Sequence, residues 1–162
     1  MTRTSRSVAQ RDPGTLLRRI GRHVPFGRDR VVLAIIRLSR SYVDHAGWID
    51  LPPPSPAASS GRSPAGSSGG TIGAAEARTS LRGMLATMAP KERPSPPTHA
   101  VVMVRCRRGR VVWLPTDDAW LHALTDESGL YGLPVADVFL VTEHGWRCRS
   151  GTTAGQLPAL AA

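Results

Sequence analysis

Arginine is the residue type in this sequence with the greatest capacity for binding chemistry. Of the 21 basic residues 20 are arginine, and the formal net charge of the chain is +9. Residues 1–50 hold ten of these arginines against four aspartates, whereas residues 99–162 carry no net charge. Because guanidinium groups bind phosphates with paired hydrogen bonds, this asymmetry predicts a basic N-terminal part that faces a polyanion. A nucleic acid and an anionic membrane surface both fit that description.

Six of the ten N-terminal arginines fall on two predicted segments. Residues 1–13 are polar and basic, and we expect them to form a disordered arm. Residues 15–24 place their apolar side chains at helical spacing and predict a short helix. The polar side of this helix carries three arginines that we expect to bind nucleic-acid phosphates: Arg18, Arg19 and Arg22. The same helix would suit an anionic membrane if its apolar side chains were inserted.

Five further arginines are predicted to share one face of a β-sheet. Residues 100–106 and 110–114 read as two strands joined by the tight turn Arg108-Gly109, and residues 146–149 alternate in the same way. Directly paired residues share a face, and this register collects Arg105, Arg107, Arg110, Arg147 and Arg149. We expect this face to bind nucleic acid. Two alternatives remain open: a solvated face, and an arginine excess caused by the GC-rich codons that the abundant residue types share.

No catalytic residue, metal site or cofactor is predicted. The turn Glu143-His144 offers an acid–base pair, but no nucleophile motif or phosphate-binding loop accompanies it. Cys106 and Cys148 are expected to be buried free thiols in a reducing compartment. A disulfide between them remains an alternative, as does a metal site formed by the two cysteines and His144, with or without His99.

The N-terminal half is predicted to be helical over residues 14–50. Its longest helix is expected at residues 29–46, where Asp29 can begin the helix and Gly47 can end it. Apolar side chains cover a broad face of this helix, which must bury against the rest of the chain or a partner.

An amphipathic helix is predicted over residues 74–89, between a low-complexity linker at 51–73 and a Pro-rich linker at 90–98. Its apolar face includes Leu81, Met84, Leu85 and Met88. Such a stripe is typical of a helix that binds a groove on a partner protein. The alternative is that the stripe docks on the rest of this chain.

Residues 99–150 are expected to form a small ββαββ domain, and residues 151–162 a loose tail. The predicted class is therefore α+β, with N-terminal helices, a linker and this C-terminal domain. The longest apolar run, residues 31–36, is too short to cross a membrane, so we expect no transmembrane segment.

These features predict a non-catalytic nucleic-acid-binding accessory protein that uses an arginine-rich arm and an arginine-bearing sheet face. The alternative is a protein-interaction adaptor whose amphipathic helices bury on a partner protein. The expected location is cytoplasmic, or nuclear or organellar in a eukaryotic source.

Overall fold

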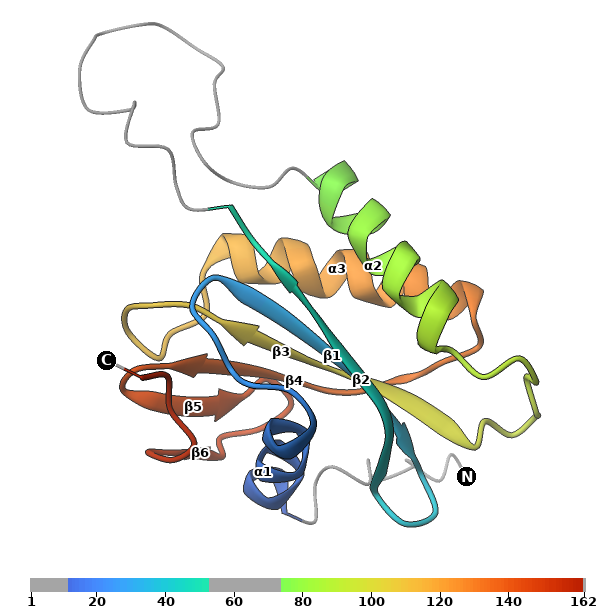
Figure 1. The fold of residues 1–162 in the computed structure, drawn as a ribbon, viewed down its shortest axis with the longest axis horizontal. Helices are drawn as coiled ribbons and strands as arrows, with labels where there is room; N and C mark the ends of the chain where they lie inside the picture. Colours follow the sequence, from blue (N-terminus) through green and yellow to red (C-terminus); the bar gives the residue numbers. More distant parts are fainter. Residues whose placement is uncertain (1–11, 53–73, 162) are drawn as a thin grey trace, which may run out of the picture.

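The computed structural model describes residues 12–52 and 74–161, which form one six-stranded sheet with helices on both faces (Figure 1). The strand order is β2-β1-β3-β4-β5-β6. The β3–β4 pair is parallel and is connected through α3, whereas the other pairs are antiparallel. The elements in chain order are α1 (Pro13–His23), β1 (Arg30–Arg37), β2 (Tyr42–Asp50), α2 (Ala74–Met88), β3 (His99–Cys106), α3 (Pro115–Leu130), β4 (Val135–Thr142), β5 (Gly145–Cys148) and β6 (Ala154–Gly155). The predicted mixture of helices and strands is confirmed at this coarse level, but the predicted layout is not.

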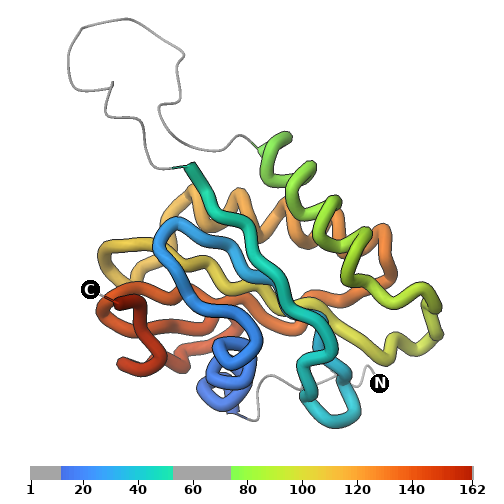
Figure 2. The backbone as a smooth tube through the Cα atoms, viewed as in Figure 1, coloured from blue at the N-terminus to red at the C-terminus, as the bar shows by residue number. Residues whose placement is uncertain are grey.

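Strand β1 lies inside the sheet and is buried on both faces. Alternate side chains pack with α2 and α3 on one face, and the others pack with α1 on the opposite face. Figure 2 shows α2 and α3 together on one side of the sheet and α1 on the other. Because β1 pairs with both β2 and β3, the N-terminal strands and the C-terminal part share one sheet rather than forming separate units.

The helix predicted over residues 29–46 is wrong, since this segment forms the β1–β2 hairpin. The apolar run at 31–36 is continuous. Such a run has no period, so it fits a buried helix segment and an interior strand that is buried on both faces equally well. Its β-branched residues favour the strand. The turn before β2 contains Ser41 with a φ of 50°, which reverses the chain.

The return strand predicted over residues 110–114 is also wrong. Residues 107–114 form a connection that we call the β3–α3 loop. Strand β3 already has β1 on one side and β4 on the other, so no edge is left for a hairpin partner. The Arg107 guanidinium donates hydrogen bonds to carbonyls within the loop, including those of Arg108 and Val112.

The amphipathic helix predicted over residues 74–89 is confirmed as α2. Leu81 and Leu85 are completely buried in the core shared with α3 and the sheet. The Arg82 guanidinium binds the Glu127 carboxylate of α3 through two hydrogen bonds of 2.9 and 3.0 Å. Leu81 and Leu85 are therefore unavailable to a partner while α2 is docked, and Met84 and Met88 are half-buried against the same core.

The C-terminal segment is more ordered than predicted. Residues 154–155 form β6 beside β5, and the side chain of Leu160 is buried. The Trp146 indole donates a hydrogen bond of 2.9 Å to the Leu157 carbonyl. The described part of the tail is thus attached to the sheet. The predicted linker lies outside the described residues except for its first two positions, and the predicted arm except for its last two, at which Asp12 and Pro13 begin α1.

Candidate functional site

A pocket lies between the last turns of α1 and the turn end of the β1–β2 hairpin. Its volume is about 570 Å³, and ligand sites typically enclose roughly 300–1,000 Å³. Within the described chain its lining contains four arginines and one histidine but no carboxylate. We call it the basic pocket, and its lining residues are Arg19, Arg22, His23, Arg37, Arg40, Tyr42 and Val43.

Helix α1 presents arginines because its apolar side is packed into the core. The Asp12 carboxylate caps the helix by accepting a hydrogen bond of 3.2 Å from the Thr15 amide. The buried side chains are Leu16, Leu17 and Ile20. Of the three arginines predicted on the opposite side, Arg19 and Arg22 line the basic pocket. Arg18 is exposed and donates to the Thr15 hydroxyl at 2.9 Å instead.

The β1–β2 hairpin supplies the other wall of the basic pocket. Arg37 and Tyr42 are register partners on either side of the turn. The Arg19 guanidinium of α1 donates a hydrogen bond of 3.1 Å to the Ser41 carbonyl in that turn. This contact fixes the helix against the hairpin and holds the two walls together.

Asp44 lies beside the basic pocket but does not line it. It falls at a β-bulge opposite Ile35 and Ile36, and bulges re-aim side chains in this way. Its carboxylate accepts a hydrogen bond of 3.1 Å from Arg37 and lies 2.7 Å from Nε2 of His99. Burial alone would raise the pKa of Asp44, but the hydrogen bonds from His99 and Arg37 hold this pKa below its ordinary value. Asp44 therefore stays ionised and orients Arg37.

The other guanidinium groups of the pocket are not neutralised. Within the part of the chain that the structure describes, no carboxylate lies within ion-pair distance of Arg19, Arg22 or Arg40. Arg22 and His23 lie in the last turn of α1, where they complement the helix dipole. That role does not account for Arg40, which comes from the hairpin. Like charges from two elements converge on one pocket, and an anionic ligand would relieve their repulsion.

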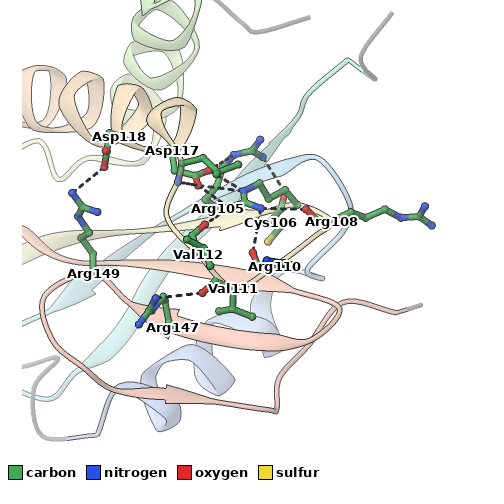
Figure 3. A network of polar contacts seen from close by, with 12 residues as sticks. Arg105, Cys106, Arg108, Arg110, Val111, Val112, Asp117, Asp118, Arg147 and Arg149 are labelled. Carbon is green, nitrogen blue, oxygen red and sulfur yellow. Dashed lines mark hydrogen bonds and ion pairs between the residues drawn. The ribbon is translucent and has the colours of Figure 1, made fainter. Parts of the chain in front are cut away.

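Two of the five arginines predicted on an exposed sheet face are buried. Arg105 and Arg107 are each 8% exposed and share the carboxylate of Asp117. Figure 3 shows Arg105 beside Asp117. Arg107 donates to Asp117 at 3.0 Å, and Nε of Arg105 lies 3.6 Å from it. Burial lowers the pKa of Arg105, although the nearby Asp117 carboxylate opposes the shift. The prediction that Arg105 and Arg107 lie on an exposed face is wrong because both side chains are buried beside Asp117.

The remaining three predicted sheet arginines lie in or against the β3–α3 loop and the start of α3. Arg147 donates a hydrogen bond of 3.4 Å to the Val111 carbonyl, and Arg149 lies 2.9 Å from the Asp118 carboxylate (Figure 3). Arg110 is exposed on the β3–α3 loop. Arg147 and Arg149 thus hold this loop and the start of α3 against the sheet.

Both cysteines are buried free thiols. Burial raises the pKa of Cys106 to about 12. Burial also raises the pKa of Cys148, and the Asp137 carboxylate, which accepts a hydrogen bond from its thiol at 2.8 Å, adds to that shift. Both thiols are therefore protonated and poor nucleophiles at neutral pH. Among the described residues, no group of His, Cys, Asp and Glu side chains is arranged to hold a metal ion.

Glu143, in the turn with His144, has a structural role. The Glu143 carboxylate accepts a hydrogen bond of 3.1 Å from the Gly109 amide in the β3–α3 loop. Hydrogen bonds from backbone amides lower the pKa of Glu143, so the carboxylate is ionised and holds the loop. His144 is exposed, and its Nε2 lies 3.8 Å from Glu143.

Sequence reasoning missed His23, Arg37, Arg40 and Tyr42 as members of a site. Arg37, Arg40 and Tyr42 fell within the helix predicted over residues 29–46, from which no common site with the arginines of residues 15–24 was predicted. The polar run that follows the apolar residues 31–36, with two serines around Arg40, was the available signal for a turn.

No family model, curated protein or solved structure matches this chain. In residues 12–52 and 74–161, no helix is long and apolar enough to cross a membrane. The function proposed below therefore rests on the geometry and charge of the basic pocket.

Proposed function

We propose that this protein binds a nucleic acid by receiving its phosphate groups in the basic pocket. One observation carries the proposal: four guanidinium groups and an imidazole from α1 and the hairpin line one pocket, and no carboxylate of the described residues lines it. Arginine matches phosphate oxygens with paired hydrogen bonds, so such a lining suits phosphate groups. Arg18, which is exposed on the same helix, extends the positive charge beyond the pocket.

A nucleic acid accounts for these features better than a membrane surface does. Membrane binding by α1 requires its apolar side chains to insert among lipids. Leu16, Leu17 and Ile20 are at most 4% exposed because they pack into the core. The helix therefore offers positive charge but no apolar face that could insert. Positive charge is what electrostatic binding to a phosphate backbone requires.

Replacing Arg22 and Arg40 together with serine is expected to weaken binding of a fluorescent oligonucleotide by roughly tenfold or more, since each arginine contributes a charge-assisted contact. If each contacts one phosphate of a single strand, the slope of log K against log salt falls in magnitude by about 1.4. Fluorescence anisotropy titrations at several salt concentrations measure both quantities.

The matched control is Arg108→Ser with Arg110→Ser, which removes the same charge from exposed positions on the β3–α3 loop. The proposal expects this control to bind nearly as well as the unchanged protein. Equal losses in the two double variants would show that net charge rather than the basic pocket governs binding. Absence of binding by the unchanged protein at low salt would refute the proposed function.

A further inference from the structure

Tyr42 is an exposed aromatic residue in the lining of the basic pocket. The residue is 59% exposed and lines the pocket together with Arg37 and Arg40. Single-stranded nucleic-acid sites typically combine a positive groove with an exposed aromatic ring on which a base stacks. The basic pocket contains both parts.

The backbone that carries Tyr42 is fixed on both sides. The preceding residue, Ser41, accepts the hydrogen bond from Arg19 of α1. The following residue, Val43, is 2% exposed and packs in the core. Tyr42 itself pairs in register with Arg37 across the hairpin. A tyrosine side chain has two rotatable bonds, so a ring on this backbone is a stacking surface that costs little conformational entropy to use.

Trp48, the other large exposed aromatic of β2, differs from Tyr42. Its exposed fraction is 46%, but the guanidinium of Arg30 already lies over its ring, 5.0 Å from the centroid. Trp48 does not line the basic pocket. Tyr42 therefore combines exposure with a place in the lining of the basic pocket, among its arginines.

We infer that Tyr42 stacks on an unpaired base while the arginines of the basic pocket hold the adjoining phosphates, so that the ligand is single-stranded nucleic acid. This inference rests on the proposed function, and it adds the class of ligand. In a duplex both faces of each base are covered by its neighbours, so a duplex offers this ring only phosphates. A single strand exposes base faces to the ring.

The test compares three ligands with the same number of phosphates in each strand: an oligothymidylate of about ten nucleotides, an abasic strand and a duplex. Replacing Tyr42 with leucine is expected to weaken binding of the oligothymidylate about tenfold. Binding of the abasic strand and the duplex should change less than twofold. Tyr42→Phe, which keeps the ring, should restore the affinity for the oligothymidylate. Tyr131→Leu changes the same residue type outside the pocket and should leave all three affinities unchanged.

The outcomes separate the inference from the proposed function. Equal effects of Tyr42→Leu on the three ligands, or failure of Tyr42→Phe to restore binding, would overturn the stacking role, even though phosphate binding itself would stand. If the unchanged protein binds none of the three ligands, the proposed function and the inference fall together. A loss of affinity on Tyr42→Leu that is confined to the oligothymidylate supports both the proposed function and the stacking role.

Discussion

Replacing Asp117 with alanine is expected to lower the free energy of unfolding by about 3–5 kcal/mol. The Asp117 side chain is completely buried and is the shared partner of Arg105 and Arg107. Its removal leaves two buried guanidinium groups without their carboxylate, and the desolvation of those charges is no longer compensated. Asp117 also accepts a hydrogen bond from the Leu114 amide at the start of α3, so that contact is lost as well.

Urea unfolding followed by tryptophan fluorescence measures this change. The matched control is Asp118→Ala, because Asp118 is the next residue in the same first turn of α3 and also binds an arginine. The side chains of Asp118 and Arg149 are 40% and 38% exposed, and exposed ion pairs contribute at most about 1 kcal/mol. A loss at Asp117 no larger than that at Asp118 would contradict the structural role assigned to the buried arginines.

A second large loss in the free energy of unfolding is expected when Leu81 is replaced. Replacing Leu81 with alanine leaves a cavity between α2, α3 and the sheet, and core leucine truncations cost about 2–5 kcal/mol. Thr87→Ala is the control on the same helix, since Thr87 is exposed and its hydroxyl bonds only to the Gly83 carbonyl of its own helix. That control should stay within about 0.5 kcal/mol of the unchanged protein.

The Leu81 result also decides whether α2 is an internal element or an exposed partner-binding helix. If α2 docks as described, Leu81→Ala shifts the urea midpoint of the isolated protein downwards. If Leu81 serves a partner instead, the isolated protein unfolds at an unchanged midpoint and the docked position of α2 is wrong.

The sequence was most informative where the periodicity was clear and local. The helical spacing of apolar residues predicted α2 over 74–89, and the structure has Ala74–Met88. The turn predicted at Glu143-His144 is also present, directly after β4 ends at Thr142. In both segments the local pattern agrees with the tertiary packing.

The failures occurred where long-range pairing overrides a local signal. The continuous apolar run of β1 has no period, because both of its faces are buried. Gly109 does adopt a backbone conformation typical of a turn, with a φ of 105°. This residue lies in the β3–α3 loop rather than in a hairpin, and its amide donates a hydrogen bond to the Glu143 carboxylate. Sequence alone did not reveal that β1 would occupy the edge of β3 that the predicted hairpin needed.

Only part of the candidate site was predicted, because its other residues are brought into place by long-range strand pairing. Arg19 and Arg22 were expected to bind phosphates, and they line the basic pocket with residues of the hairpin. Their partners Arg40 and Tyr42 were missed because the turn that brings them to α1 depends on the β1–β2 pairing. The prediction for Arg105 and Arg107 failed because their alternation with apolar residues indicated an exposed sheet face. Both are buried because α3 places Asp117 beside them.

Amide NMR spectra of the isotope-labelled protein, recorded during titration with a single-stranded oligonucleotide at low salt, test the central claim most directly. The basic pocket predicts that the largest shift changes fall on residues 19–23 and 37–43, which carry its lining side chains. They should diminish as salt is added, because phosphate contacts release counterions. Changes concentrated instead on the β3–α3 loop and β5, or no changes in the described residues, would contradict the assignment of this pocket as the binding site.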